Sequence, residues 1–386
     1  MISSSINIAI IGGGPGGLTL ARLLQLQGFR VTVFEKDAHR HVRQQGATLD
    51  LHADSGLKAL RAAGLLGNFQ QHYRPGADRI KITDQHGTVF HSDHDMPRAE
   101  DFENPHYRPE IDRGPLRDLL NDWLQPGTVT WDAAFESMKP AGSGWEILFR
   151  NGNTFFADLV IGADGAYSKV RPWLTPIRPV YSGITVIEGN VYNAATSAPK
   201  LFRLVEGGKL FAFGGEKSLI LSAKGDGALS FYTGCREAEN WPAASGIDFS
   251  DREQVRRWFS ETFSEWDPLW QELITGDNLK VIPRPMYHFP LDQQWDSQSN
   301  LTLIGDAAHV MPPYAGEGVN MAMLDALELS EQLATSGENL QPAISAYEKA
   351  MLKRAASVTA ITLEQTDLLH GADALQYMLQ AFGTAS

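Results

Sequence analysis

The chain has very little cysteine and no long apolar run. Cys235 is the only cysteine among 386 residues, so an intramolecular disulfide and a cysteine-based metal cluster are excluded. This scarcity suits a reducing compartment. No stretch approaches the roughly 18 apolar residues that a membrane span requires, and the N-terminus lacks the basic and apolar segments of a secretion signal. We therefore predict a cytoplasmic protein with no membrane partner.

Positive charge is also scarce. Lysine and arginine number 33 against 46 aspartates and glutamates, which gives a formal net charge of −13. A surface of this sign repels nucleic acid and mainly serves solubility. The G-x-S-x-G elbow of serine hydrolases does not occur in the chain. Nucleic-acid binding and serine hydrolysis are therefore disfavoured.

Three histidines lie close together in the sequence without the spacing of a metal site. His86, His91 and His94 stand among turn and solvent-type residues. They lack the helical H-x-x-x-H spacing that would place two ligands on one face. We predict exposed loop histidines rather than ligands, and we name no metal site.

What the chain does contain is the composition of an ordinary globular protein. Hydrophobic residues make up 43% and charged residues 20%, which argues against disorder. The length of 386 residues exceeds what one simple core accommodates. Two domains that share a ligand are the natural expectation.

A glycine-rich turn near the N-terminus predicts a nucleotide site. An apolar strand, a turn, a helix and a second strand follow one another, and Gly12, Gly14 and Gly17 match G-x-G-x-x-G within that unit. The first glycine makes the turn, the second admits a pyrophosphate, and the third lets the helix lie close to the strand. Glu35, 18 residues past Gly17, is placed to accept hydrogen bonds from a ribose. The alternative is an ordinary strand-turn-helix unit.

Two later apolar stretches, residues 159–163 and 301–304, lead into acidic residues, Asp164 and Asp306. Continuous apolar strands of this kind belong to a buried parallel sheet, and ligands of open α/β sheets bind at the carboxyl ends of such strands. We expect a helix after Asp164. Arg113 opens another predicted helix, where it is either a cofactor contact or a surface arginine.

The middle of the chain changes to short alternating strands. These predicted strands cover residues 184–191, 201–205, 209–213, 218–223 and 228–233. Without helices between them they indicate a separate antiparallel layer. A charged helix over 251–263 follows. Four tryptophans gather here, where we expect core packing, with ligand stacking as the alternative: Trp241, Trp258, Trp266 and Trp270. From residue 341 onward the chain is almost continuously helical and has no new strand to pack on, so this helix is expected to lie across the domains.

The glycine turn with Glu35, Asp164-Gly165 and Gly305-Asp306 together resemble the single-component FAD-dependent aromatic hydroxylases, the class A flavin monooxygenases. The resemblance spans nearly the whole chain. It is closest to the tetracycline-inactivating flavin monooxygenases, through three segments: Gly46-Ala47-Thr48-Leu49-Asp50-Leu51-His52, Ala63-Gly64-Leu65-Leu66, and Gly305-Asp306-Ala307-Ala308-His309 continuing to Asn320.

The resemblance implies an α/β fold with a Rossmann-type FAD-binding domain, an antiparallel β-sheet substrate domain and a long C-terminal helix. The FAD-binding domain would be discontinuous, over residues 1–76, 98–177 and 283–345. The substrate-binding domain would take 77–97 and 178–282, and a bridging helix 346–386.

The resemblance also implies FAD and NADPH as cofactors. It places the FAD pyrophosphate at the glycine turn, the adenosine ribose at Glu35, the ribityl chain near Arg113 and Asp306, and Asp50 close to the flavin. Arg43 would contact NADPH. The helix start at 316–320 would face the flavin pyrimidine, where its N–H groups stabilise negative charge. The implied cofactor-binding positions are Gly12, Gly14, Gly17, Glu35, Lys36, Arg43, Asp50, Arg113, Asp164, Asp306, Pro313, Gly316, Gly318 and Asn320.

The implied reaction is oxygenation of an electron-rich polycyclic or phenolic substrate by NADPH and dioxygen through a flavin hydroperoxide. This scheme requires no general acid or base, so no catalytic side chain is named. The partners would be a small aromatic or polyketide molecule and dioxygen, and the protein a monomer. The implied substrate-binding positions are Glu188, Lys209, Phe211, Ser230, Tyr314 and Met321.

Several positions depart from the tetracycline-inactivating pattern. Glu188, Lys209 and Ser230 stand where those relatives carry glutamine, arginine and histidine. Glu317 and Lys36 stand where they usually carry glutamine and arginine. Tetracycline and another aromatic or polyketide metabolite therefore both stay open as substrates. An NAD-dependent dehydrogenase that uses only the glycine turn, and a non-catalytic flavin-binding module, are the remaining alternatives.

Overall fold

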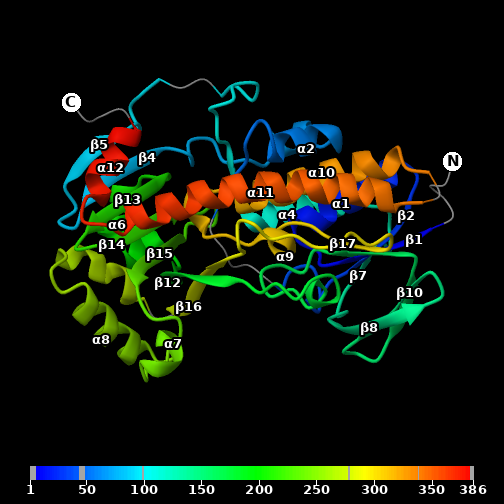
Figure 1. The fold of residues 1–386 in the computed structure, drawn as a ribbon. Coiled ribbons are helices and arrows are strands. Elements are labelled where there is room, and N and C mark those ends of the chain that lie inside the picture. The colour runs from blue at the N-terminus through cyan, green and yellow to red at the C-terminus, as the bar shows by residue number, and fades with distance from the viewer. Residues whose placement is uncertain (1–5, 43–47, 98–99, 277–278, 338, 383–386) are drawn as a thin grey trace.

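The predicted fold class is confirmed by a computed structural model, in which a parallel sheet with helices and a larger antiparallel sheet form the two halves of the molecule (Figure 1). The structure describes residues 6–42, 48–97, 100–276, 279–337 and 339–382. Within these ranges no helix is long and apolar enough to cross a membrane.

The first half is built on a five-stranded sheet in the order β17-β11-β1-β2-β7, whose neighbouring strands all run parallel. Its strands are β1 (Asn7–Ile11), β2 (Arg30–Phe34), β7 (Val129–Thr130), β11 (Leu159–Gly162) and β17 (Leu301–Leu303). Ile11 lies opposite Gly162, and Gly162 opposite Leu303. The segments that follow β1, β11 and β17 therefore meet at one edge of the sheet.

Helices and smaller strands surround this sheet. The helices are α1 (Pro15–Leu26), α2 (Gly56–Ala62), α3 (Leu66–Phe69), α4 (Arg113–Asp122), α9 (Asp306–His309) and α10 (Gly318–Ala334), with the short 3₁₀ helices η1 (Arg171–Trp173) and η3 (Pro313–Ala315). The smaller strands are β3 (Leu49–Asp50), β6 (Glu110–Ile111), β8 (Phe135–Ala141), β9 (Gly144–Phe149) and β10 (Thr154–Ala157).

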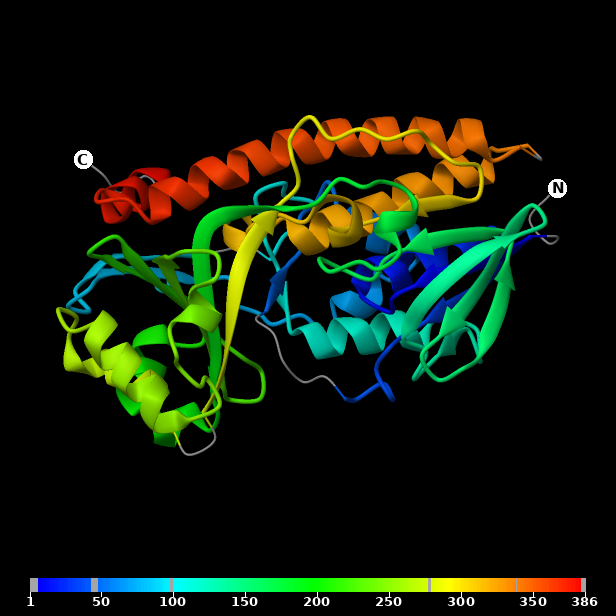
Figure 2. The same cartoon turned by 60° about the horizontal axis from the view of Figure 1, so that its bottom comes forward.

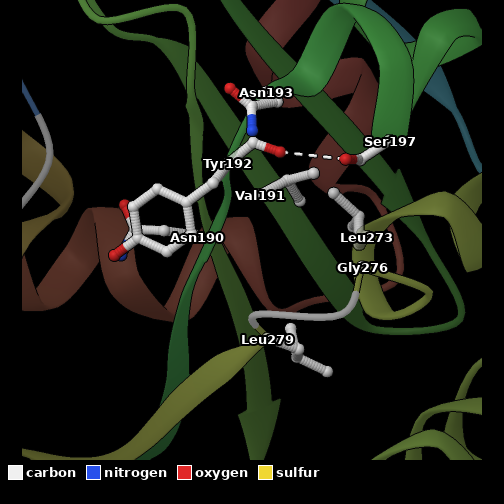
Figure 3. A pocket seen from close by; sticks show the side chains of 8 residues that line it. All are labelled: Asn190, Val191, Tyr192, Asn193, Ser197, Leu273, Gly276 and Leu279. Atoms are coloured by element: carbon white, nitrogen blue, oxygen red, sulfur yellow. Dashed lines mark hydrogen bonds between the residues drawn. The ribbon is translucent and has the colours of Figure 1, made fainter.

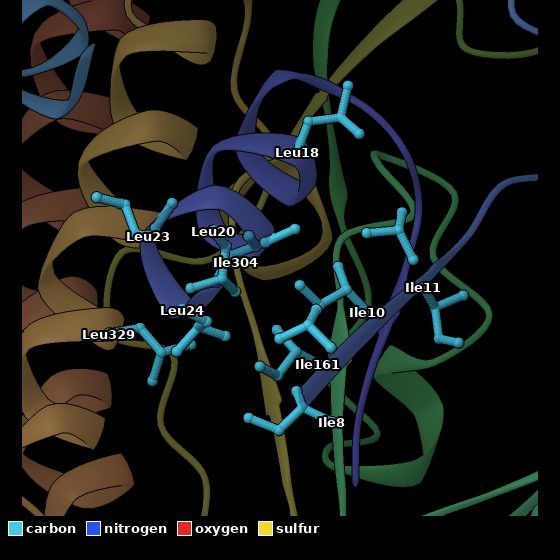
Figure 4. Close-up of a cluster of buried hydrophobic side chains, with 14 of the residues drawn as sticks. Ile8, Ile10, Ile11, Leu18, Leu20, Leu23, Leu24, Ile161, Ile304 and Leu329 are labelled. Atoms are coloured by element: carbon cyan, nitrogen blue, oxygen red, sulfur yellow. The ribbon is translucent and has the colours of Figure 1, made fainter. Parts of the chain in front are cut away.

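The core of this half lies between the sheet, α1 and α10. Ile10, Leu20 and Ile161 are completely buried there, and Figure 4 shows their side chains pointing toward one another. A Cβ on Gly16 would lie 3.0 Å from the Cβ of Ala322, so the small residues let the two helices touch. This contact holds the start of α1 close to the start of α10.

The second half is a seven-stranded sheet in the order β16-β12-β15-β14-β13-β4-β5. Its strands are β4 (Ile80–Asp84), β5 (Val89–Ser92), β12 (Val180–Val191), β13 (Lys209–Gly214), β14 (Lys217–Ala223), β15 (Leu229–Arg236) and β16 (Lys280–His288). One face is covered by α5 (Ala194–Ser197), α6 (Pro199–Val205), α7 (Trp241–Ala244), α8 (Arg252–Thr262) and the 3₁₀ helix η2 (Pro268–Ile274). All four tryptophans pack in this layer, as expected.

Three local predictions are wrong. Residues 201–205 belong to helix α6, because Pro199 at its first turn favours a helix and Leu201 and Val205 are spaced to bury one helical face. The helix expected after Asp164 is only η1, because the Asp164 carboxylate accepts hydrogen bonds from the backbone of Lys169 and Val170 and closes a turn. Of the three histidines expected to be exposed, only His86 is; His91 is buried on β5 and the His94 side chain is only 8% exposed.

The C-terminal helix α11 (Gln341–Leu369) is the longest element of the chain. Its 29 residues correspond to about 43 Å at 1.5 Å per residue. It packs along α10 and against η3, and α12 (Ala374–Ala381) then contacts β4 and β13 (Figure 2). The helix thus connects the two halves, starting at Gln341.

Candidate functional site

The glycine turn has the geometry that an anion site requires. Gly12 has a φ of 118°, and a Cβ on it would lie 2.2 Å from the carbonyl oxygen of Ala163. A Cβ on Gly17 would lie 2.1 Å from the carbonyl oxygen of Gly12. By contrast, a Cβ on Gly14 would meet no atom within 4 Å. The first and third glycines therefore close the turn, while the second leaves open space in front of the α1 N-terminus, where backbone N–H groups attract an anion.

Glu35 stands at the carboxyl end of β2, bound to this turn. Its carboxylate accepts hydrogen bonds from the backbone N–H of Gly13 at 2.7 Å and of Asp37 at 3.0 Å. Arg117, on α4, donates to the Gly13 carbonyl oxygen at 3.2 Å and to the Asp37 carboxylate at 2.9 Å. Sequence reasoning missed Arg117, although it follows Arg113 by one helical turn. Of the other basic positions, Lys36 is exposed, and Arg43 lies outside the described residues, as do Gly46 and Ala47.

Asn320 joins β3, η3 and α10 at the opposite end of this edge. Its side-chain amide donates to the carbonyl oxygens of Asp50 at 2.9 Å and Gly316 at 3.1 Å. Its oxygen accepts from the backbone N–H of His52 at 2.9 Å. Asn320 is completely buried. A Cβ on Gly316 would lie 3.0 Å from the Asp50 carboxylate, so the predicted positions Asp50, Gly316 and Asn320 are in direct contact.

His52 lies between two carboxylates beside this junction. Its Nε2 is 3.0 Å from Asp50 and its Nδ1 is 3.4 Å from Glu317. Burial opposes charging of His52, but the hydrogen bonds to Asp50 and Glu317 outweigh it and raise the pKa of His52 to about 9. The pKa of Asp50 is lowered to about 2, because the charges of Lys209 and His52 outweigh burial. A role for His52 was missed, although it stands within the segment that carries the resemblance.

Asp306 begins α9 at the end of β17, and its carboxylate accepts no hydrogen bond from the described residues. Burial raises its pKa, against the opposing charges of His309 and Arg113. A Cβ on Gly318 would lie 3.8 Å from the Asp306 carboxylate, so the start of α10 is close by. A half-buried carboxylate of this kind favours a hydroxyl donor, as a ribityl chain would offer.

A second acid, Asp325 on α10, holds this strand end in place. Its carboxylate accepts from the backbone N–H of Gly305 at 2.8 Å and lies 2.6 Å from Nε2 of His309. Arg354 of α11 donates to it at 2.6 Å. Sequence reasoning missed Asp325, since nothing local marks a helical acid as the partner of a distant turn.

The predicted substrate residues of the antiparallel sheet share one face. Leu210, Leu221 and Phe231 pack in the core on the side of α6, so the residues that alternate with them point to the opposite side, which we call the inner face. Opposed residues of antiparallel strands point to the same side. Two rows across the inner face follow from the register: Lys209, Ser222, Ser230 and Asn190 form one, and Phe211, Ile220, Tyr232 and Glu188 form the other.

Both charged residues in these rows are paired. The Lys209 ammonium contacts the carboxylate of Glu110, which is completely buried on β6. The Glu188 carboxylate contacts Arg284 on β16. Burial raises the pKa of Glu110 to about 6, although Lys209 opposes the shift. Glu110 and Arg284 were not predicted, because each lies about a hundred residues from its partner.

The predicted positions Pro313, Tyr314 and Met321 differ in their exposure and in what they contact. The Tyr314 hydroxyl lies 3.1 Å from Nε2 of His370, and a Cβ on Gly234 of the inner face would lie 2.8 Å from it. Pro313 is exposed, and Met321 is buried at 2% exposure in α10. Tyr314 therefore reaches the inner face.

The structure also contains a hollow of about 160 Å³ away from this region (Figure 3). It lies at the end of β12 and is lined by apolar residues of η2 and polar residues near α5, among them Leu273, Asn193 and Ser197. Ser197 donates a hydrogen bond to the Tyr192 carbonyl oxygen there at 3.0 Å. Among the described residues no cluster of three or more histidine, cysteine or acidic side chains has the arrangement of a metal site.

The arrangement at the sheet edge fits an extended dinucleotide. The open space at Gly14 suits a pyrophosphate, and the carboxylate of Glu35 lies beside it. Asp306, at the carboxyl end of β17, has a carboxylate that can accept a hydrogen bond from a ligand. The N-terminus of α10 adds a favourable site for negative charge. These features lie on segments far apart in the sequence, as a long cofactor requires.

Comparison with known proteins agrees with this geometry. The family model described as FAD binding domain matches residues 5–362 of the chain. The 3-amino-4-hydroxybenzoate 2-monooxygenase PtmB3 of Streptomyces platensis is 28% identical over 380 residues, covering 97% of this chain and 91% of that protein. The solved structure of Klebsiella pneumoniae HpxO complexed with FAD and uric acid is 22% identical, with a TM-score of 0.76 over 98% of this chain and 92% of that one. The tetracycline destructase Tet(51) is 18% identical, with a TM-score of 0.71 over 97% and 95%. At these identities the two structures establish a shared fold and not a shared substrate.

Proposed function

This chain belongs to the FAD binding domain family of class A flavin monooxygenases, and from that premise we propose that it uses NADPH and dioxygen to hydroxylate an electron-rich polycyclic or phenolic substrate. The coarser statement, an FAD-dependent monooxygenase of aromatic or polyketide substrates, follows from the family and from its monooxygenase relatives. The observation that carries the proposal is the meeting of Gly14, Asp306 and the α10 N-terminus at one sheet edge.

The glycine turn would hold the phosphates of FAD, and Glu35 the adenosine ribose. Gly13 and Asp37 orient the Glu35 carboxylate through backbone hydrogen bonds, so that a carboxylate acceptor is held beside the turn where ribose hydroxyls would lie. Arg117 fixes the turn from the other side through the Gly13 carbonyl oxygen. These contacts position the cofactor and take no part in chemistry.

The residues around Asn320 would hold the reactive end. FAD, when bound, supplies the activation of dioxygen and the transfer of one oxygen atom to the substrate. The N–H groups at the start of α10 stabilise negative charge there, and the imidazolium of His52 adds a positive charge beside Asp50. Asn320 keeps β3, η3 and α10 in register by three hydrogen bonds. The inner face supports the substrate opposite them.

The proposal is tested by purifying the protein and supplying NADPH. We expect a yellow protein with flavin absorbance, NADPH oxidation that accelerates with an aromatic substrate, and a product heavier by one oxygen atom. A colourless protein that binds only NAD would indicate a dehydrogenase. A yellow protein whose NADPH oxidation no aromatic compound accelerates would indicate a flavin-binding module.

Inactivation of tetracycline is a second candidate, favoured by the contact between the resembling segments at Asp50 and Asn320. The departures at Glu188, Lys209 and Ser230 weaken it. We expect slow tetracycline turnover, because geometry at the cofactor sets the reacting distance. The variant Glu188→Gln, Lys209→Arg, Ser230→His should be faster, measured by NADPH consumption and product mass. No turnover by either protein, with FAD bound in both, would reject tetracycline.

A further inference from the structure

The charged side chains that the four central strands place on the inner face are already paired within the protein. The four central strands β12 to β15 place three charged side chains on that face, and each contacts a side chain of opposite charge. The pairs are Lys209 with Glu110, Glu188 with Arg284, and Arg236 with Asp367. The strands involved lie entirely within the described residues. The other side chains that these four strands place on the face are hydroxyl, amide or apolar. Exposed Lys280 lies at the margin of the face, on the edge strand β16 opposite Asn190.

Lys209 is the cation best placed to attract an anionic substrate, and it faces two carboxylates. Glu110 contacts its ammonium, and Asp50 lies opposite Glu110 in the β3–β6 pair. The charges of Glu110 and Asp50 raise the pKa of Lys209 against the effect of burial. An incoming carboxylate would have to compete with both protein acids for one ammonium group.

Glu188 and Arg284 neutralise each other on adjacent strands. The Glu188 side chain is 8% exposed, so its carboxylate is held close to the sheet, while Arg284 reaches it from the edge strand β16. Arg236 lies 3.2 Å from Asp367 and donates to the carbonyl oxygen of His370. The charge of each arginine is thus balanced by a neighbouring carboxylate.

We propose that the substrate carries no negative charge on the part that rests against the inner face. This inference rests on the proposed function, which places an aromatic substrate there. A carboxylate buried against already paired cations would lose its hydration without gaining a partner. Phe211, Ile220 and Tyr232 lie side by side in one row and are half-buried, which suits the face of an uncharged aromatic ring. The class is a flat, neutral aromatic molecule.

The test compares aromatic acids with their own amides on the FAD-loaded protein. Two matched pairs serve, 3-amino-4-hydroxybenzoate with its amide and 6-hydroxy-2-naphthoate with its amide. Binding is measured from the change in flavin absorbance, and stimulation from NADPH oxidation. We expect at least one amide to bind about tenfold or more tightly than its acid, the effect of one unfavourable charge.

Two variants then free one cation each. Glu110→Gln removes the carboxylate that contacts Lys209 and leaves only the charge of Asp50 near it, and Glu188→Gln leaves Arg284 unpaired. Each should move the ratio of acid to amide affinity toward the acid by about tenfold, the worth of one charge-assisted hydrogen bond. Glu253→Gln is the matched control, because it frees Arg256 on α8, on the covered side of the sheet, and should leave the ratio unchanged.

The outcomes separate this inference from the proposed function. A protein that retains no FAD contradicts the function itself. With FAD bound, tighter binding of the acids by the wild type overturns the inference, and so does the failure of every amide to bind. If Glu110→Gln does not fold, the ratio of acid to amide affinity in the wild type and in Glu188→Gln still tests the inference. An equal ratio in wild type and both variants would also count against it.

Discussion

Gly14 is the glycine of the turn whose missing side chain leaves space and closes no contact. A valine there would occupy the space in front of the α1 N-terminus, where an added Cβ meets no protein atom within 4 Å. We expect Gly14→Val to fold normally and to raise the FAD dissociation constant about a hundredfold or more, which corresponds to roughly 3 kcal/mol. Flavin fluorescence on titration into the stripped protein measures this.

The matched control for this substitution is Gly67→Val. Gly67 lies in α3, and a Cβ on it also meets no atom within 4 Å. It should retain FAD as the wild type does. A yellow Gly14→Val protein with unchanged affinity would contradict the role assigned to the turn.

His52 predicts a dependence of stability on pH. Its pKa is raised from an ordinary 6.5 to about 9 in the folded protein. Protonated His52 therefore contributes its full share to the free energy of unfolding below pH 6.5, and this contribution is lost as the pH rises through 9. The change in pKa corresponds to a stabilisation of about 3 kcal/mol, since one pKa unit corresponds to 1.36 kcal/mol. Urea unfolding of wild type and His52→Asn from pH 6 to 10 measures it, and the difference between the two proteins should shrink toward pH 10. A constant difference would show that His52 is neutral in the folded protein.

At the scale of elements, a neutral histidine side chain helps to bind the end of α11 to the antiparallel sheet. Burial lowers the pKa of His370 to about 4, and its Nδ1 donates to the Thr366 carbonyl oxygen at 2.7 Å. Its Nε2 is therefore an acceptor, 3.1 Å from the hydroxyls of Tyr314 and Ser218. His370 is a positioning residue for Tyr314.

We expect His370→Phe to retain FAD but to raise the substrate KM about fivefold, because one neutral hydrogen bond contributes about 1 kcal/mol. More hydrogen peroxide should form per NADPH as the substrate is held less firmly. His72→Phe is the control, since exposed His72 makes the same contact with a carbonyl oxygen four residues earlier, that of Asn68. A change in kcat alone, with KM and peroxide unaltered, would argue against positioning.

For the whole molecule, the C-terminal helices couple the two halves. Met378 and Ala374 of α12 pack against Ile82 and Phe213 of the antiparallel sheet. Removal of residues 371–386 should lower the free energy of unfolding by about 2 to 4 kcal/mol, mostly through the exposed apolar surface. FAD affinity should change little, since the glycine turn is remote from α12. Removal of residues 383–386 alone is the control, and equal stability of both truncated chains would refute the coupling.

The parts of the fold that the sequence predicts correctly have a local signal. Gly12, Gly14 and Gly17 follow a strand and open a helix, and alternation along β12 to β15 marks a layer with two distinct faces. Residues 201–205 are an example in which the local pattern does not distinguish a strand from a helix. Leu201 and Val205 fit a short apolar strand as well as a helix, and only the surrounding α layer decides between them.

The sequence by itself determined the fold of the cofactor half of this protein, because the glycine turn, the acid after the second strand and the acids at two later strand ends each follow a recognisable local pattern. The tertiary structure alone decided which charges are available to a ligand. Lys209 meets Glu110, and Glu188 meets Arg284, across about a hundred residues each. Pairing of that kind depends on strand register and domain contact, so the charge presented to the substrate is a property of the folded molecule and not of any segment.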